Sequence, residues 1–186
     1  MPGSFAVGLA HVCRSEGLDE AALFFGLAPP PGRRAAREAM PWPVAAALLE
    51  RLEGLRPSAL RALAEQLAGA CVLACVSSRA FESSRTLFDA ALREWPRYWG
   101  VLDASQRDGD GWHVVMTRLR SPFRPCEAFF RLQAEVLRLL PAATGSAPVE
   151  VDALIQPGAG LYRVSLARDS ARAEPQQPTA QLCGEL

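Results

Sequence analysis

The chain has 186 residues, 49% of them hydrophobic and 22% charged, so it is long enough and apolar enough to fold as one medium-sized domain. Its formal net charge is zero, which argues against direct binding of nucleic acid or of an anionic membrane surface. All 20 basic residues are arginines, so mechanisms that need a lysine, such as Schiff-base catalysis, are excluded.

The sequence also lacks the features of a membrane or secreted protein. No apolar run reaches the roughly 18 residues that a membrane-spanning helix needs. The first residues, MPGSFAVGLAHVCRSEG, have no basic segment, and they carry His11 and Arg14 where a signal peptide is apolar. We therefore expect a cytoplasmic protein with no membrane partner.

Helical spacing of apolar residues dominates the first half of the chain. It predicts five helices, at residues 4–16, 20–26, 43–55, 57–76 and 83–95. Gly17 ends the first helix and Asp19 is placed to cap the second. The proline-rich segment 27–43 breaks the helical pattern, and we expect it to be an exposed crossover whose Arg33, Arg34 and Arg37 face solvent.

The second half begins with alternating residues. PRYWGVLDASQ (96–106) and GWHVVMTRLRS (111–121) alternate with period two around RDGDG, which predicts a β-hairpin. A helix between Pro125 and Pro141 follows, and a second hairpin is expected around the turn QPGAG. The fold class is therefore α+β, with a helical half (4–96) and a ββαββ half (97–167) that forms a four-stranded antiparallel sheet. These halves make one domain of residues 1–167, and residues 168–186 are expected to be a disordered tail or a linker.

One stretch resembles known sensory proteins. In FRPCEAFFRLQAEVLRLLPAATGSAPVEVDALIQPGAGLYRVSL, a Pro-Cys-x-x-Phe-Phe helix precedes Leu-Pro, Val-Glu-Val and a final Tyr-Arg-Val strand. This pattern resembles the N-terminal sensory region of certain bacterial histidine kinases. More loosely, it is similar to the effector-binding N-terminal domain of AraC-type transcription regulators, and the order of elements resembles the haem-based nitric oxide sensor domains called H-NOX.

The resemblance implies a signalling role. It covers residues 4–167 in layout and 121–167 closely, and its matching residues are packing and turn residues with no catalytic signature. A sensory or dimerisation module is implied, whose output domain, a histidine kinase or a DNA-binding domain, is supplied in cis or in trans. H-NOX sensors carry a Tyr-x-Ser-x-Arg motif that binds the haem propionates. The corresponding residues here, Leu119-Arg120-Ser121-Pro122-Phe123-Arg124, lack the tyrosine.

Cysteine and histidine residues are the candidates for metal or haem ligation. Cys71 and Cys75 share one helix face, and His11 with Cys13 could complete a set of soft metal ligands. Their apolar surroundings favour core packing over a metal site. His113 would be the haem ligand, but alternation with Trp112 places it on the strand face away from the helices, so we expect an exposed histidine. No cofactor is predicted.

Cys126 opens the last helix, where backbone N–H groups favour a thiolate and could make it reactive towards oxidants or acyl groups. Glu127 opposes this effect through its like charge. Nucleophilic catalysis also needs a base and an orienting group, and the chain has only two histidines. We therefore predict a structural cysteine and no enzymatic activity.

Aromatic residues indicate a ligand pocket between the helical half and the sheet. Phe129 and Phe130 are adjacent on a helix and point about 100° apart, so one can enter the core while the other lines a cavity or an interface. The predicted pocket residues are Phe88, Trp95, Trp112, Cys126, Phe129 and Phe130. Ordinary core packing and a protein interface are the alternatives.

The sequence therefore predicts a non-enzymatic input module of a bacterial signalling protein. A small apolar or amphipathic ligand, or a partner, would bias the packing of the helical half against the sheet and act on the segment after strand 161–166. A haem or metal sensor that uses His113, His11 or the cysteines, and a pure homodimerisation module, are the alternatives.

Overall fold

The computed structural model describes residues 1–27, 39–75, 84–109 and 112–165. They form α1 (Gly3–Ser15), α2 (Glu20–Phe24), α3 (Trp42–Leu55), α4 (Ser58–Cys75), α5 (Ser84–Trp99), β1 (Leu102–Gly109), β2 (Trp112–Leu119), α6 (Glu127–Leu139), the 3-10 turn η2 (Ala142–Thr144), β3 (Glu150–Gln156) and β4 (Ala159–Ser165). Five helices followed by hairpin, helix and hairpin confirm the predicted α+β class. The expected crossover arginines at 33, 34 and 37 and the expected tail at 168–186 lie outside the described residues.

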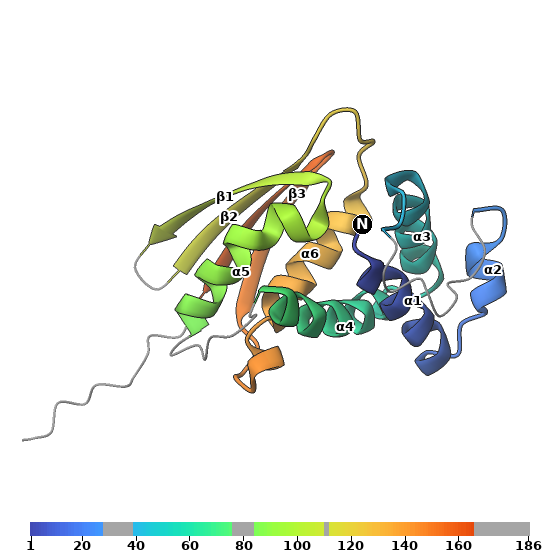
Figure 1. The fold of residues 1–186 in the computed structure, drawn as a ribbon, viewed down its shortest axis with the longest axis horizontal. Coiled ribbons are helices and arrows are strands. Elements are labelled where there is room, and N and C mark those ends of the chain that lie inside the picture. Colours follow the sequence, from blue (N-terminus) through green and yellow to red (C-terminus); the bar gives the residue numbers. More distant parts are fainter. Residues whose placement is uncertain (28–38, 76–83, 110–111, 166–186) are drawn as a thin grey trace, which may run out of the picture.

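The four strands form one antiparallel sheet in the order β1-β2-β4-β3. The two hairpins are thus joined through β2 and β4, which leaves β1 and β3 as the edges. Helix α5 packs against β1, and α6 packs against β3 and β4. Both helices lie on the same side of the sheet, as Figure 1 shows. We call the side that faces them the inner face and the opposite side the outer face.

Several expected start and stop signals act as their chemistry predicts. The Asp19 carboxylate accepts hydrogen bonds from the backbone N–H groups of Ala21 (2.9 Å) and Ala22 (3.2 Å) at the start of α2. Gly17 has φ of 64°, a left-handed conformation that ends α1 at low cost. Gly158 follows Pro157 with φ of 78°, as a tight two-residue turn between β3 and β4 requires.

Helix α5 runs further than its sequence pattern predicts. It continues through Pro96 to Trp99, so the expectation that residues 96–99 belong to a strand is wrong. Trp95 and Trp99 lie four residues apart on one face of this helix, and both are fully buried. That burial outweighs the hydrogen bond that the proline removes. The helix ends at Gly100, which has φ of 73° and whose N–H donates to the Pro96 carbonyl.

Strand β2 presents the opposite face from the one expected. His113, Val115, Thr117 and Leu119 are buried against the helices, whereas Met116 is exposed. The prediction of an exposed His113 is therefore wrong. Its ring stacks on Phe88 of α5, with centroids 6.2 Å apart. The error arose because Trp112, Val114 and Met116 are the more apolar set, yet they lie on the outer face.

Helix α6 is the centre of the molecule. It contacts α3 and α4 of the helical half and β3 and β4 of the sheet. Nine of its residues are buried, so its hydrophobic surface extends over more than one face. Any rearrangement of the helical half relative to the sheet must therefore move α6.

Among the described helices, none is both long and apolar enough to cross a bilayer.

Candidate functional site

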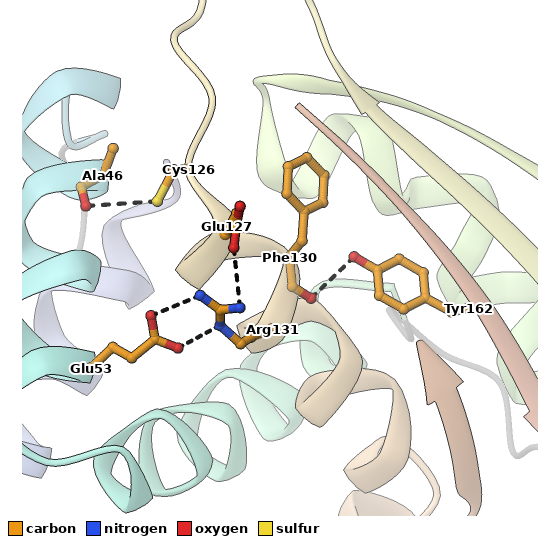
Figure 2. Close-up of polar contacts among 7 residues, drawn as sticks. All are labelled: Ala46, Glu53, Cys126, Glu127, Phe130, Arg131 and Tyr162. Carbon is orange, nitrogen blue, oxygen red and sulfur yellow. Dashed lines mark hydrogen bonds and ion pairs between the residues drawn. The ribbon is translucent and has the colours of Figure 1, made fainter. Parts of the chain in front are cut away.

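Cys126 occupies the N-cap position of α6, where sequence reasoning placed it. Its side chain is 2% exposed, and the thiol donates a long hydrogen bond to the Ala46 carbonyl of α3 at 3.7 Å. Figure 2 shows this contact reaching across to the helical half. Burial raises the pKa of the Cys126 thiol to about 11, so at neutral pH it is protonated and a poor nucleophile.

The predicted aromatic residues of α5 and α6 form a packed interior. Phe88, Trp95, Phe129 and Phe130 are all fully buried. Phe129 lies edge-on to Trp42 at 4.9 Å and to Trp99 at 5.3 Å between ring centroids. These edge-to-face arrangements are the favourable geometry for aromatic pairs. Phe129 thereby joins α3, α5 and α6 in one cluster.

Buried polar groups hold the same interior in place. The Trp95 indole N–H donates to the Gln133 side-chain carbonyl at 3.0 Å, and both side chains are fully buried. The Tyr162 hydroxyl of β4 donates to the Phe130 carbonyl of α6 at 3.1 Å (Figure 2). Desolvation by burial raises the pKa of Tyr162, so the hydroxyl stays a donor. These bonds fix the register of α6 against α5 and the sheet.

Trp112 lies apart from the other five predicted pocket residues. Its position on β2 puts it on the outer face, with the Arg163 guanidinium 5.7 Å from the ring centroid. Phe88, Trp95, Phe129 and Phe130 are on the inner side of the sheet, and Cys126 is at the α3–α6 contact. A pocket lined by all six residues stays a prediction.

The structure does contain a groove between the two halves. It has a volume of about 450 Å³ and is formed by the C-terminal end of α3, the start of α4, one face of α6 and the inner face of β3. We call it the seam groove. It is lined by Glu53, Pro57, Leu60, Arg61, Arg131, Ala134, Glu135, Arg138, Val151, Ala153 and Ile155. Its volume lies within the range of about 300–1,000 Å³ in which proteins hold small molecules.

The seam groove has an apolar floor and a charged rim. Arg131 is held by Glu53 of α3, with Nε to Oε1 at 2.5 Å and Nη2 to Oε2 at 3.2 Å, and by Glu127 at 3.3 Å (Figure 2). These hydrogen bonds raise the pKa of Arg131 above its ordinary value. Arg138 pairs with Glu135 one turn away. The carboxylates of the rim therefore already have arginine partners.

Arg61 is the least constrained cation of the rim. Among the described residues, its ion pair is with Glu65 in the next turn and spans 3.9 Å, and both side chains are more than half exposed. Exposed pairs of this kind contribute about 0–1 kcal/mol. The Arg61 guanidinium is thus available to an anionic group at the mouth of the groove.

A second, smaller groove of about 210 Å³ lies between α5 and β1. It is lined by Leu92, Arg93, Pro96, Ala104, Ser105, Gln106 and Val115. Neither groove is lined by any of the six predicted pocket residues. The smaller groove is lined by α5 of the helical half and by β1 and β2 of the sheet, but by no residue of α6.

Sequence reasoning missed the seam groove although its pattern was visible. Glu127, Arg131, Glu135 and Arg138 follow one another at helical spacing along α6. Such a charged stripe normally faces solvent, but here it reaches Glu53 of α3. On β3, Val151, Ala153 and Ile155 alternate on one face, which marks them as inward-facing.

The fold of this chain, unlike its sequence, is similar to that of a known protein. The sequence matches no protein-family model and no curated protein. The structure is similar to the crystal structure of an H-NOX protein from S. oneidensis in the Fe(II)NO ligation state, with a TM-score of 0.59. The two share 10% sequence identity over 90% of this chain and 100% of that chain. The likeness confirms the H-NOX topology, whereas the kinase and AraC resemblances stay predictions.

The interior does not fit a haem. A porphyrin plane needs about 7 Å between the groups that hold it, since carbon atoms pack about 3.5 Å apart on each side. Here the rings of the Phe129 cluster lie edge-on to one another with centroids 4.9–5.6 Å apart. Of the two histidines, His11 is exposed on α1 and His113 is stacked on Phe88.

The described cysteines and carboxylates were compared with the needs of a metal site. Among the described residues, no group of three or more His, Cys, Asp or Glu side chains is arranged to hold a metal ion. Cys13 and Cys71 are buried, and the side chain of Cys75 and all of Cys183 lie outside the described residues. Cys13 has its thiol pKa raised, first by burial and then by Glu20. The described cysteines thus have the surroundings of core residues.

Proposed function

We propose that this chain is a non-enzymatic sensory or regulatory input module that binds a small amphipathic ligand in the seam groove. The observation that carries the proposal is the position of the groove, because its walls come from α3 and α4 on one side and from α6 and β3 on the other. A ligand there contacts both halves of the domain at once. The H-NOX-like fold supports a sensory role.

The ligand class follows from the lining. Leu60, Val151 and Ile155 offer apolar surface for a hydrocarbon body. Arg61 offers a guanidinium at the rim, and Arg131 and Arg138 add positive charge beside their carboxylate partners. A carboxylate with a short hydrocarbon chain matches this arrangement. We use decanoate as the probe.

A non-enzymatic role is supported by the state of Cys126. This thiol was the one candidate nucleophile, and it is buried with its pKa raised to about 11. Its partner within hydrogen-bonding reach is a backbone carbonyl, which cannot take up a proton as a general base does. A packing role at the α3–α6 contact accounts for its position.

Signal transfer would pass through α6 and the neighbouring edge of the sheet. The groove touches α6 over two turns, from Arg131 to Arg138, and α6 is bonded to β4 through Tyr162. A ligand that binds one arrangement of α4 against β3 more tightly shifts the population towards it. Strand β4 precedes the C-terminal segment, through which a kinase or DNA-binding output domain, in cis or in trans, would receive the change. A cytoplasmic location completes the proposal.

Calorimetric titration with decanoate tests the proposal. The wild-type domain should bind decanoate and gain thermal stability with rising ligand concentration. Arg61→Glu should weaken binding at least tenfold. The matched control is Arg97→Glu on α5, an arginine that is also more than half exposed, with an i,i+3 ion pair, and that lies outside the groove. Equal losses in both variants would mean that net charge, and not the rim, governs binding.

A second pair of variants tests the floor of the groove. Ala153 is exposed on the inner face of β3, so Ala153→Trp should fill the groove without entering the core. Gln156→Trp, on the outer face of the same strand, is the control. Decanoate binding should disappear in the first variant and persist in the second. Unchanged binding in Ala153→Trp, or no binding to the wild type, would refute the proposed site.

A further inference from the structure

The outer face of the sheet carries a row of exposed apolar side chains. Met116 of β2 is paired with Leu161 of β4, which is paired with Leu154 of β3. Their side chains are 53%, 40% and 59% exposed, respectively. On a half-solvated antiparallel sheet, the outer face is normally polar. An apolar row at the centre of such a face indicates that something covers it.

Charges flank this row on the two edge strands. Arg107 of β1 and Asp152 of β3 both lie in the row next to the apolar one, at opposite edges of the sheet. Within the described part of the chain, neither forms an ion pair. Asp103, which lies on the outer face of β1, is already held by Arg120 at 2.8 Å. Arg107 and Asp152 are therefore charges that remain available to a partner, as are Arg118 of β2 and Glu150 of β3 in the rows beyond.

We propose that two copies of this chain pair through their outer sheet faces, related by a twofold axis that runs parallel to the strands. In that arrangement β1 of one copy faces β3 of the other, and β2 faces β4. Each row of residues then faces the same row. Met116 meets Leu161 of the second copy, and Arg107 meets Asp152 of the second copy, each contact occurring twice.

The remaining outer-face residues agree with this pairing. Arg163 comes opposite Val114 and Asp103 opposite Gln156. Arg118 comes opposite Ala159 and Glu150 opposite Gly109, so no like charges face each other. Within its own chain, the Arg163 guanidinium carbon lies 5.7 Å from the centroid of the Trp112 ring. A face whose charges complement themselves under a twofold rotation favours a second copy over an unrelated partner.

The size of the face sets the strength of the dimer. Four strands about 4.8 Å apart and seven residues of about 3.3 Å each give a face of roughly 440 Å² per copy. The total, roughly 900 Å², is below the 1,200–2,000 Å² of stable complexes. The dimer is thus weak, and its population depends on concentration. This pairing is independent of the seam groove, which opens on the inner side of the sheet.

Sedimentation equilibrium over micromolar to millimolar concentrations tests the proposal. The average mass should rise from 20.1 kDa towards twice that value. Leu161→Glu should reduce association at least tenfold, because it places two charges at the centre of the interface. Leu73→Glu, on α4 and 79% exposed, should leave association unchanged. A monomer at every concentration, or equal effects of the two variants, would overturn the proposal.

Charge reversal in trans tests the pairing itself. Arg107→Asp alone and Asp152→Arg alone should each abolish association, since each places like charges opposite each other twice. An equimolar mixture of the two variants should associate again, because every contact then joins Asp with Arg. Recovery on mixing cannot come from a folding defect. Failure to recover in the mixture, with the wild type dimeric, would refute the proposed orientation.

Discussion

Replacing Phe129 tests whether the aromatic interior is a well-packed core or contains a ligand cavity. The side chain is fully buried and contacts Trp42, Trp99 and Phe130 edge-on at 4.9, 5.3 and 5.5 Å. Truncation of a buried phenylalanine costs about 3–5 kcal/mol. The upper part of that range applies, since the three aromatic pairs are lost as well. For a chain of this size, about 4–5 kcal/mol corresponds to a fall in Tm of roughly 8–20 °C.

Calorimetry of Phe129→Ala beside Phe123→Ala measures this difference. Phe123 is partly buried and contacts Trp42 with centroids 6.2 Å apart, so its truncation should cost only about 1–2 kcal/mol. Relative to the wild type, Phe129→Ala should therefore lose at least about 2 kcal/mol more unfolding free energy than Phe123→Ala. A loss below about 1.5 kcal/mol in Phe129→Ala would mean that the ring borders empty space, and the interior would again be a candidate ligand pocket.

Four further predictions concern the Cys126 thiol, two glycines and haem. Cys126 should react with iodoacetamide at neutral pH at least about tenfold more slowly than free cysteine, since its pKa of about 11 leaves little thiolate; rapid alkylation would contradict the structural role. Because folding raises this pKa, the protonated thiol stabilises the fold below pH 8.5. This contribution, up to roughly 3 kcal/mol, should fade between about pH 8.5 and 11 in the wild type and not in Cys126→Ala, as urea unfolding at each pH would reveal. Gly160→Ala should destabilise the fold by about 1–3 kcal/mol, because the added Cβ would lie 2.2 Å from the Tyr162 hydroxyl. Gly54→Ala should stabilise the fold by about 0.5–1 kcal/mol, because its added Cβ would have no atom within 4 Å. Equal effects of the two substitutions would refute the packing described. Protein purified from cells supplied with a haem precursor should show no Soret band, and a stoichiometric band would show that the interior opens to a haem.

The order of elements could be predicted because its signals are local. The Asp19 cap, the left-handed Gly17 and the Pro157-Gly158 turn act within a few residues, so neighbours in sequence decide them. The end of helix α5 was predicted wrongly because Pro96 is a local stop signal for helices. Tertiary burial of Trp95 and Trp99 overrides it, and no local pattern reports that burial.

The faces of the strands could not be predicted from polarity alone. On β2 the buried set contains His113 and Thr117, and the outer set contains Trp112 and Met116. Alternation showed that the two sets point apart, but it could not show which set the helices cover. On β2 the outer set is the more apolar one, which agrees with the proposed contact with a second copy.

The seam groove could not be predicted without the tertiary structure, because its lining comes from segments far apart in the sequence. Arg131 and Glu53 are 78 residues apart in the chain, and their contact places the polar stripe of α6 at the boundary between the halves. The aromatic residues drew the prediction to the interior because large rings are typical of ligand pockets. In this fold they fill the interior, and the open space lies one helix face away.

Backbone amide NMR shifts on titration with decanoate test the central account most directly. We expect the largest changes in the residues of the seam groove on α4, α6 and β3, around Arg61, Arg138 and Ala153, with smaller changes along β4. Signals of α5 and of the inner face of β2, around Phe88 and His113, should stay in place. Shifts centred on Phe88 and His113, with the groove signals unmoved, would contradict the account and return the ligand to the interior.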